Sequence, residues 1–391
     1  MTIWNFILFA FGFVLLVQGA EALVRGASKL AVTVGLSPLV VGLTIVAYGT
    51  SAPELSVSLT SIISDRASLA VGNAIGSNIT NILLILGICA VIAPIMVLKQ
   101  VVQIDIPVMI LTTGLLLPLC LDGFIDRIDG VILFLIAVVY TISVANREST
   151  DELQESPIAP LDLTASDRLD RPNFPERANP PVPTDPPLPL VLHFPRIVVS
   201  LIQVGLGTGM LVLGSRWLVE GAVAIATALG VDELIIGLTV VAVGTSLPEL
   251  AASVVATIEG ERDIAIGNVI GSNICNVVIV LGLPALISSD AVAVAPDALQ
   301  LNIPFAVAVE IFCLPIAFTG YMVSRWEGFL FLFYYVSYVV YLLLKAMNSQ
   351  TLPGFESLML KVVIPLTVII LLITTVHAVH RNRSHSSEIE S

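Results

Sequence analysis

Long apolar segments, separated by short polar ones, make up most of the chain. Crossing the roughly 30 Å hydrocarbon core of a bilayer takes about 20 helical residues, and eleven segments of the sequence approach or exceed that length. The first segment has no basic start and no small-residue cleavage site, so we expect a retained helix rather than a signal peptide. The predicted membrane-spanning helices are 5–24, 37–62, 67–94, 103–121, 129–146, 196–224, 234–258, 265–288, 301–320, 327–346 and 359–379.

Composition excludes an ordinary soluble domain. Hydrophobic residues make up 56% of the 391 positions and charged residues only 12%, whereas about a quarter of the residues of a soluble domain are charged. The net charge of −13 does not indicate a basic partner, because nine of the 30 acidic residues lie between Glu148 and Asp185, outside every apolar segment. We expect the lipid bilayer as the surrounding partner, and no nucleic acid.

A proline-rich polar segment, 147–195, separates the first five apolar segments from the last six. Its eleven prolines and high polarity leave too little apolar surface to offset the entropy lost on folding. We therefore expect a disordered tether. A folded calcium-sensing loop is the alternative, but about 49 proline-broken residues are few and irregular for a sensor domain.

The distribution of Lys and Arg predicts the orientation, because cytoplasmic loops are enriched in both. With eleven spans, the side that holds the linker collects twelve of these residues and the other side four, while Arg216 falls within a span. We expect a multi-pass protein of the cell membrane. Its N-terminus would be external, and its central linker and C-terminus cytoplasmic.

An internal repeat defines the architecture. Residues 35–94 align with 230–289 at a constant offset of 195 without a gap, and 28 of the 60 positions are identical. The shared words include Glu, Pro and Asn in register, as in GLTIVAYGTSAPEL from Gly42 and GLTVVAVGTSLPEL from Gly237. Chance similarity between apolar sequences would match only residues such as Leu, Val and Ala, so the repeat indicates an internal duplication.

The two copies are predicted to be inverted. Five spans separate corresponding points, and an odd number reverses the direction of the chain across the membrane, which relates the copies by a pseudo-two-fold axis in the membrane plane. The fold class is therefore an all-α membrane protein with two inverted repeats of five transmembrane helices and an extra C-terminal helix. We expect a first repeat at 1–146, the linker at 147–195, a second repeat at 196–346, and the additional helix and tail at 347–391.

One acidic residue in each copy follows a proline inside a membrane span. Pro53 and Pro248 have no backbone N–H to donate, so each helix should kink just before Glu54 and Glu249. The freed carbonyls need a partner in hydrocarbon, and the inverted repeat should bring the two carboxylates together near the bilayer midplane. The neighbouring Thr50, Ser51, Thr245 and Ser246 add hydroxyl oxygens.

This oxygen-rich set predicts a cation site. Two buried carboxylates are costly unless their charge is neutralised, and two negative charges match one Ca²⁺ or two Na⁺. Carboxylate, hydroxyl and carbonyl oxygens are typical ligands of Ca²⁺. No nitrogen or sulfur ligand lies nearby, which argues against zinc, copper or nickel.

A second repeated word supplies a polar stripe. Asn73, Ser77 and Asn81 are spaced four residues apart and so share one helical face, and Asn268, Ser272 and Asn276 repeat the stripe. These side chains could offer oxygens to a cation or could bond neighbouring helices. Gly72 and Gly76 have the small-residue spacing that lets helices approach closely.

Other polar residues fit structural roles. The four cysteines lie in apolar segments without CxxC spacing and predict buried small side chains rather than disulfides or zinc ligands. Glu21 with Arg25 and Arg216 with Glu220 predict ion pairs within helices. Glu310 could line a pathway or bond a neighbouring helix, and the aromatic run 329–341 is expected to serve lipid-facing and interfacial packing. The sequence shows neither a nucleophile beside a His base nor a phosphate-binding loop, so we do not expect an enzyme.

At these residues the chain resembles the calcium/cation antiporter superfamily, in particular its prokaryotic sodium/calcium exchanger branch. The resemblance rests on the paired words GTSxPE and GSNxxN and covers both repeats. It implies a calcium site formed by Thr50, Ser51, Glu54, Thr245, Ser246 and Glu249. The sodium ligands that it implies are Ala47, Ser51, Glu54, Ser77, Asn81, Ala242, Ser246, Glu249, Ser272 and Asn276, with Asn73, Asn268, Pro53 and Pro248 supporting them.

The implied function is secondary active antiport: Ca²⁺ leaves the cell by alternating access as Na⁺ enters, with these ions as cargo and no cofactor. Several members of the superfamily carry Asp at the position of Asn276, and potassium-dependent members use it for K⁺, so potassium coupling is not expected. Exchange of Ca²⁺ for H⁺ at the same two glutamates is the alternative. A cation channel is a third hypothesis, disfavoured because channels usually build their filters by subunit symmetry. We expect a monomer.

Overall fold

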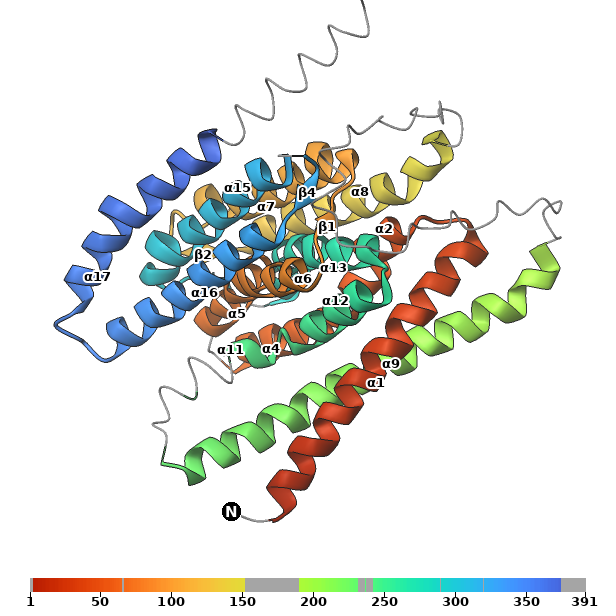
Figure 1. Ribbon diagram of the computed structural model, residues 1–391, viewed down its shortest axis with the longest axis horizontal. Coiled ribbons are helices and arrows are strands. Elements are labelled where there is room, and N and C mark those ends of the chain that lie inside the picture. Colours follow the sequence, from red (N-terminus) through yellow and green to blue (C-terminus); the bar gives the residue numbers. More distant parts are fainter. Residues whose placement is uncertain are drawn as a thin grey trace, which may run out of the picture.

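The computed structural model describes residues 3–64, 67–151, 190–230, 236, 242–288, 290–318 and 320–373 (Figure 1). The elements of this part are helices and four two-residue strands, joined by short turns and loops. Most of the predicted linker (152–189) and the last 18 residues (374–391) lie outside it.

The first repeat contains five membrane-crossing units. Several helices include a π-helical turn, in which the backbone hydrogen bond reaches one residue further than in an α-helix. The elements are α1 (Ile3–Val34), α2 (Pro38–Val41), η1 (Gly42–Val46), α3 (Ala47–Thr50), α4 (Ala52–Ile63), α5 (Ala67–Thr80), η2 (Asn81–Leu86), α6 (Gly87–Ile92), β1 (Ile95–Met96), η3 (Val101–Asp105), α7 (Ile106–Leu119), β2 (Phe124–Ile125) and α8 (Arg127–Asp151), with η marking π-helical turns.

The second repeat follows the same order. Its elements are α9 (Leu190–Ala228), α11 (Ala242–Gly244), α12 (Leu247–Glu259), α13 (Arg262–Cys275), η5 (Asn276–Leu281), α14 (Gly282–Ile287), β3 (Val292–Ala293), η6 (Ala298–Asn302), α15 (Ile303–Phe318), β4 (Met322–Val323) and α16 (Arg325–Ala346). The extra helix contains α17 (Leu352–Leu358) and η7 (Met359–Val363) and continues to residue 373.

The described residues account for ten of the eleven predicted spans. Nine helices are long and apolar enough to cross a membrane, and a bent pair, Pro38–Thr50 with Ala52–Ile63, makes a tenth. The remaining span, predicted at 234–258, is described only at residue 236 and from residue 242 onward. The helical membrane fold predicted from the sequence is therefore confirmed.

Several boundaries differ from the prediction. Helix α1 continues to Val34 rather than ending near residue 24, because Glu21 and Arg25 do not break a helix. It stops before Gly35, whose φ of +79° favours glycine. Helices α8 and α9 reach Asp151 and Leu190, so both ends of the predicted 147–195 linker are helical.

Helices α1 and α9 show that the repeats are inverted, since they are equivalent elements that run antiparallel side by side (Figure 1). A Cβ atom on Gly12, Gly19 or Gly26 of α1 would lie 2.8, 2.9 or 3.2 Å from the backbone oxygens of Gly214, Gly207 and Ser200, respectively. The residue numbers of the contacts decrease along α9 as they increase along α1, so the two helices run antiparallel. Glycine thus lets the two backbones meet directly.

Two short antiparallel ribbons join the repeats. Ile95 of β1 pairs with Val323 of β4, and Phe124 of β2 pairs with Ala293 of β3. Each ribbon contains one strand from each repeat. The first strand of one repeat pairs with the second strand of the other in both ribbons, as a pseudo-two-fold axis requires. The strands are an addition to the all-helical expectation.

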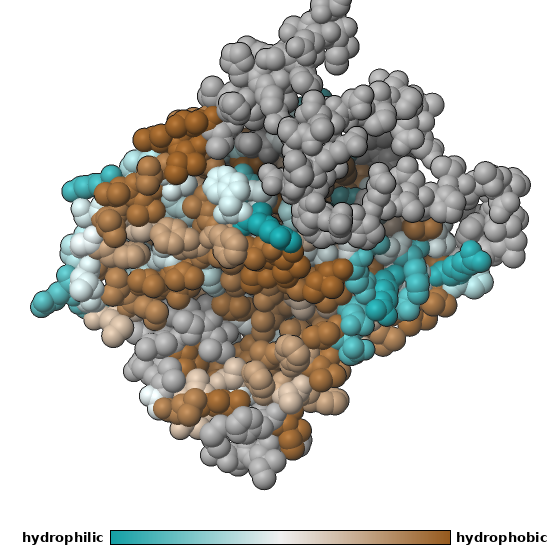
Figure 2. Space-filling model, in the orientation of Figure 1, coloured by the Kyte–Doolittle hydropathy of each residue, from teal (hydrophilic) through white to brown (hydrophobic). Residues whose placement is uncertain are grey.

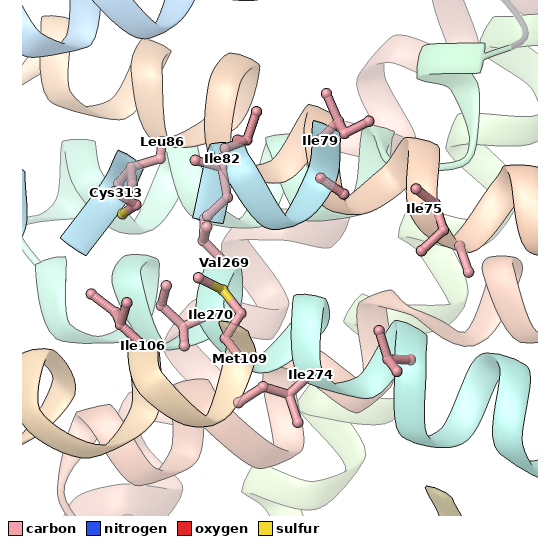
Figure 3. Packing of buried hydrophobic residues seen from close by; sticks show 14 of the residues in the cluster. Ile75, Ile79, Ile82, Leu86, Ile106, Met109, Val269, Ile270, Ile274 and Cys313 are labelled. Carbon is pink, nitrogen blue, oxygen red and sulfur yellow. The ribbon is translucent and has the colours of Figure 1, made fainter. Parts of the chain in front are cut away.

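The core is apolar and is shared by both repeats. Figure 3 shows side chains of the first repeat, among them Ile79 and Ile82, in one cluster with Val269, Ile270 and Ile274 of the second. The outer surface is also largely hydrophobic on the face seen in Figure 2. Leu111 and Val139 are 70% and 66% exposed, as expected for side chains that face lipid.

The aromatic run 329–341 faces lipid only in part. Phe329 is exposed, but Phe331 is fully buried, and the Tyr334 hydroxyl donates to Thr367 Oγ1 at 2.8 Å. The expected lipid-facing packing therefore holds for Phe329 but not for Phe331, and the bond from Tyr334 attaches the extra helix to α16. The four cysteines are buried and free, as predicted.

Candidate functional site

A helix break precedes each of the two glutamates, as predicted. The helical axis bends by 42° between α3 and α4, where Ser51 (φ −79°, ψ 6°) leaves the helical region. Ser246 (φ −85°, ψ 8°) takes the same conformation before α12. Pro53 and Pro248 stand in the first turns of the new helices, where the missing N–H is not needed.

The carboxylates of Glu54 and Glu249 are deeply buried, at 0% and 1% exposure. The hydroxyl of Ser51 donates to Glu249 Oε1 at 3.2 Å and so joins the two copies at the break. Both carboxylate oxygens of Glu54 and the Oε2 of Glu249 have no hydrogen-bond partner among the described residues. Three buried carboxylate oxygens are therefore available to bind a proton or a cation.

Hydroxyl contacts cross from one repeat to the other. Thr50 Oγ1 donates to Asn268 Oδ1 at 3.1 Å and lies 3.5 Å from Ser272 Oγ. Ser246 Oγ donates to Ser77 Oγ at 3.2 Å. Each kinked helix thus lies against the polar stripe of the other repeat.

The remaining predicted residues surround these contacts. The carbonyl of Ala47 accepts from Thr50 Oγ1 at 3.3 Å, and Thr245 is half-buried at the second break. Ala242 begins α11, while residues 237–241 before it are outside the described part.

Asn73 and Asn268 hold the glutamates through the backbone. Asn73 Nδ2 donates to the carbonyl of Glu54 at 3.2 Å, and Asn268 Nδ2 donates to that of Glu249 at 3.3 Å. Asn268 also donates to Ser253 Oγ at 2.9 Å. These bonds favour a supporting role, in which the amides fix the helices that carry the carboxylates.

Asn81 and Asn276 begin π-helical turns at equivalent positions, η2 and η5. Each uses its amide nitrogen as a donor, to Asn273 Oδ1 at 2.9 Å and to Asn78 Oδ1 at 3.1 Å, respectively. The Oδ1 atoms of both Asn81 and Asn276 are buried without a partner in the described chain. Both amide oxygens are thus also free to ligate a cation.

The sequence reasoning missed Asn78 and Asn273. Asn78 Nδ2 donates to the backbone oxygen of Asn273 at 3.2 Å, and Asn273 Nδ2 donates back to the oxygen of Asn78 at 3.3 Å. Both were visible as repeated letters in the GSNxxN words, but they lie beside the chosen stripe rather than in it.

The donor set favours a hard cation. Within the described ranges no group of three or more His, Cys, Asp and Glu could hold a metal. A cation between the two carboxylates would find mainly hydroxyl, amide and carbonyl oxygens, which suits Ca²⁺ and Na⁺. The expectation that no sulfur lies nearby was wrong, because the Cys275 thiol interacts with Ser51 at the break.

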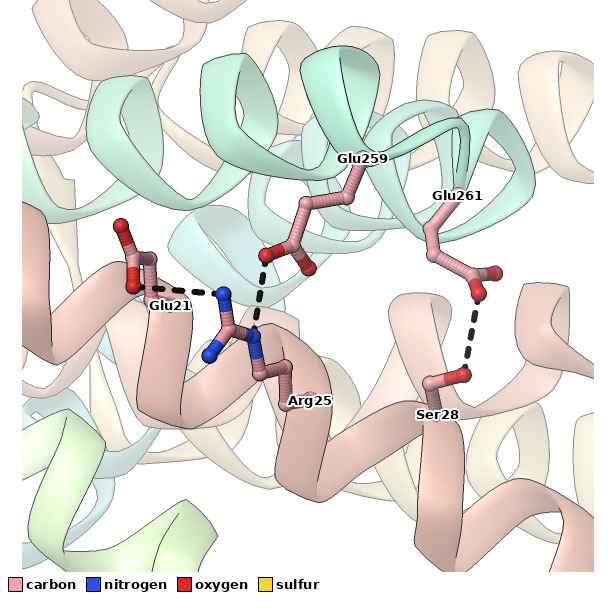
Figure 4. Close-up of polar contacts among 5 residues, drawn as sticks. All are labelled: Glu21, Arg25, Ser28, Glu259 and Glu261. Carbon is pink, nitrogen blue, oxygen red and sulfur yellow. Dashed lines mark hydrogen bonds and ion pairs between the residues drawn. The ribbon is translucent and has the colours of Figure 1, made fainter.

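Away from this site, both predicted ion pairs are present. Arg25 pairs with Glu21 at 3.4 Å and Arg216 with Glu220 at 2.8 Å. Arg25 also reaches Glu259 at the end of α12, at 3.1 Å, and the Ser28 hydroxyl donates to Glu261 at 3.0 Å (Figure 4). These two bonds connect α1 to the second repeat.

Comparison with known proteins identifies the family. The sodium/calcium exchanger protein family matches residues 4–145 and 199–344. The putative antiporter CaxA of Alkalimonas amylolytica is 36% identical over 302 residues, covering 75% of this chain and 85% of CaxA. The sodium/calcium exchanger MaX1 of Methanosarcina acetivorans is 30% identical over 323 residues, covering 76% and 87%.

A solved structure agrees with this match. The sodium-calcium exchanger NCX_Mj, soaked with Na⁺ and Sr²⁺, superposes with a TM-score of 0.68 and 29% identity, over 87% of this chain and 99% of NCX_Mj. The prediction of a multi-pass transporter rather than an enzyme is confirmed by these relationships. The chain belongs to the sodium/calcium exchanger family, within the calcium/cation antiporter superfamily.

Proposed function

We propose that this antiporter moves Ca²⁺ out of the cell in exchange for Na⁺, with both ions competing for one site between Glu54 and Glu249. The observation that carries the proposal is the pair of buried carboxylates with three unpartnered oxygens at the repeat interface. Two desolvated negative charges are stable only when positive charge accompanies them. One Ca²⁺ or two Na⁺ would neutralise them, so the site need not be empty in either half of the cycle.

The ligands follow from the cross-repeat contacts. Calcium would bind Glu54 and Glu249 together with the hydroxyls at the two breaks, from Thr50, Ser51, Thr245 and Ser246. Sodium ions would share the carboxylates and add the outer oxygens, from Ala47, Ser77, Asn81, Ala242, Ser272 and Asn276. The free Oδ1 atoms of Asn81 and Asn276 support this second assignment.

Alternating access would come from movement of α1 and α9 over the rest of the protein. These helices contact each other closely through glycine and backbone atoms, which supports their movement as one unit. The inverted repeat makes the inward-open and outward-open states near mirror images. Exchange results if the protein changes between the two states only when its site holds Ca²⁺ or Na⁺.

The proposed orientation places the linker and the C-terminus in the cytoplasm and the N-terminus outside. The contacts agree with the expected alternation of loops. Arg25 meets Glu259 on one side, whereas Lys345 meets Asp297 at 3.1 Å on the other. The excess of Lys and Arg on the Arg25 side favours that side as cytoplasmic.

The test is ⁴⁵Ca²⁺ flux in proteoliposomes under an imposed Na⁺ gradient or an imposed pH gradient, each alone. The Na⁺ gradient should drive uptake in the wild type, and Glu54→Gln or Glu249→Gln should abolish it. Glu220→Gln, at a surface ion pair of α9, is the matched control and should transport normally. Uptake driven only by the pH gradient would favour Ca²⁺/H⁺ exchange, and currents that persist without a counter-ion gradient would favour a channel.

A further inference from the structure

A third carboxylate lies buried beside the proposed cation site. Glu310, on α15, is 1% exposed. Its Oε1 accepts from Thr113 Oγ1 at 2.9 Å and from Asn78 Nδ2 at 3.3 Å. Its Oε2 is buried and has no hydrogen-bond partner in the described part of the chain.

The surroundings of Glu310 do not supply a positive charge. Its hydrogen-bond partners Thr113 and Asn78 are neutral, and no ion pair found in the described residues includes it. An ionised carboxylate at such depth costs several kcal/mol without a counter-charge. One carboxylate is neutralised by one monovalent cation.

Orienting the neighbouring amide does not explain why this residue is a glutamate. The repeat places Leu115 at the equivalent position in α7. Asn273, the counterpart of Asn78, donates to the Asn78 carbonyl, accepts from Asn81 and also interacts with Glu310. A neutral amide at position 310 could accept from these asparagines as well, so the charge of Glu310 is more than their hydrogen bonds require.

A short chain of hydrogen bonds connects Glu310 to the central site. Asn78 donates to Glu310 through Nδ2 and accepts from Asn276 Nδ2 through Oδ1, at 3.1 Å. The Oδ1 of Asn276, which we assign to the sodium ligands, is buried without a partner in the described chain. Two amides thus separate the third carboxylate from an oxygen that we assign to sodium.

We propose that Glu310 is a third ion-binding carboxylate of this exchanger, which takes up one monovalent cation, Na⁺ or a proton, on Oε2 and is coupled to the central site through Asn78. The inference rests on the proposed exchange and extends its stoichiometry. A buried negative charge at Glu310 attracts cations to the central site, and neutralising it weakens that attraction. The binding of a monovalent cation at Glu310 is therefore coupled to the exchange of Ca²⁺ and Na⁺ between Glu54 and Glu249.

Other titratable groups near α15 are accounted for. The described residues of α5, α7, η2, η6 and β4, which pack against α15, include none. Asp105 of η3 accepts from Tyr140, and Tyr334 and Tyr338 of α16 pack against Phe312 and Phe305. Cys313 lies one turn away on α15 itself. Glu327 of α16, which lies near Cys313, accepts from the backbone N–H and the hydroxyl of Ser324.

The test compares wild type with Glu310→Gln and Glu220→Gln in proteoliposomes, by measuring Ca²⁺ flux against Na⁺ concentration at several fixed pH values. Glu310→Gln keeps an acceptor for Asn78 and loses the charge. If Na⁺ is the occupant, this variant loses one sodium site and its Na⁺ dependence becomes shallower. If a proton is the occupant, its pH dependence is lost while the Na⁺ dependence keeps its steepness. Glu220→Gln removes a carboxylate from a surface ion pair of α9 and should retain both dependences.

Glu310→Gln with wild-type Na⁺ and pH dependences would overturn the proposal. If Glu54→Gln abolishes transport in the same experiment, the proposed function stands and only the role of Glu310 fails. If Glu54→Gln transports normally, the proposed function itself fails.

A second measurement uses the wild type alone and so does not depend on folding of a variant. Dicyclohexylcarbodiimide modifies protonated carboxyl groups in lipid, and mass spectrometry of the peptide that contains Glu310 reports the labelling. Protection by Na⁺ at fixed pH supports sodium, and a decline with rising pH that Na⁺ does not alter supports a proton. Labelling that changes with neither, or no labelling under any condition, overturns the proposal.

Discussion

Asn78 and Asn273 each donate a side-chain amide to the backbone carbonyl of the other, at 3.2 and 3.3 Å. The two residues are 195 positions apart, the same offset that relates the repeats, so the pair lies on the pseudo-two-fold axis. Each side-chain oxygen accepts from the next asparagine of the opposite stripe. One reciprocal contact thus holds both polar stripes in register around the proposed cation site.

Removing either member of this pair should destabilise the protein. Asn273→Ala leaves Asn81 Nδ2 and the Asn78 carbonyl without their partner, and each unsatisfied buried group costs about 1–3 kcal/mol. Asn78→Ala should cost at least as much, because it also releases Glu310. Thermal unfolding in detergent measures the effect, with the exposed Ser56→Ala as control; equal melting temperatures in all three variants would contradict the shared role.

The two supporting asparagines should differ in importance. Asn73 makes one bond, to the Glu54 carbonyl, whereas Asn268 bonds the Glu249 carbonyl, Ser253 and Thr50. Each hydrogen bond contributes about 0.5–1.5 kcal/mol. We therefore expect Asn268→Ala to raise the KM for Ca²⁺ about tenfold more than Asn73→Ala does. Flux at varied Ca²⁺ concentration tests this, and a larger effect of Asn73→Ala would be inconsistent with the contacts.

The features that could be predicted from sequence are those set by covalent geometry or by the repeat. Pro53 and Pro248 mark the starts of new helical segments, because a residue without an N–H fits the first turn of a helix better than its interior. The constant offset and the odd number of spans predict inversion without any side-chain contact. The pairing of the copies around Glu54 and Glu249 follows from these two facts.

The features that could not be predicted depend on tertiary packing. Asn78 follows Ser77 directly, so it lies about 100° around the helix from the chosen stripe, and only the contact with the other repeat shows that both faces are used. Glu310 has no repeated counterpart, so symmetry gave no indication of its partner. The apolar pattern predicts an end of the first span near residue 24, where charged residues begin, but α1 continues past Glu21 and Arg25 to Val34.

Close packing of α1 against α9 should make Gly207 intolerant of a side chain. A Cβ there would lie 2.5 Å from the backbone nitrogen of Leu23 and 2.8 Å from the Gly19 oxygen, so Gly207→Ala must separate the helices. Overpacking of this kind costs about 1–3 kcal/mol. Gly209→Ala is the matched control, since nothing lies within 4 Å of a Cβ at that position. Melting temperatures should fall for Gly207→Ala alone, and equal falls in both variants would disprove the packing explanation.

The ion pair between Arg25 and Glu259 should affect conformation more than stability. Arg25 is 58% exposed at its side chain and Glu259 26%, and an exposed pair contributes about 0–1 kcal/mol. Because the pair joins α1 to α12, its loss shifts the equilibrium toward conformations in which these two helices are apart. A change of about 1 kcal/mol shifts that equilibrium by about fivefold. Glu259→Gln should therefore raise the rate of amide hydrogen exchange at the end of α12 by up to about fivefold while the melting temperature changes little.

Glu220→Gln removes an ion pair that lies within α9, so it should leave that exchange rate unchanged. An equal increase in both variants would show that α1 and α12 are not held together by Arg25, because only one of the two pairs connects them.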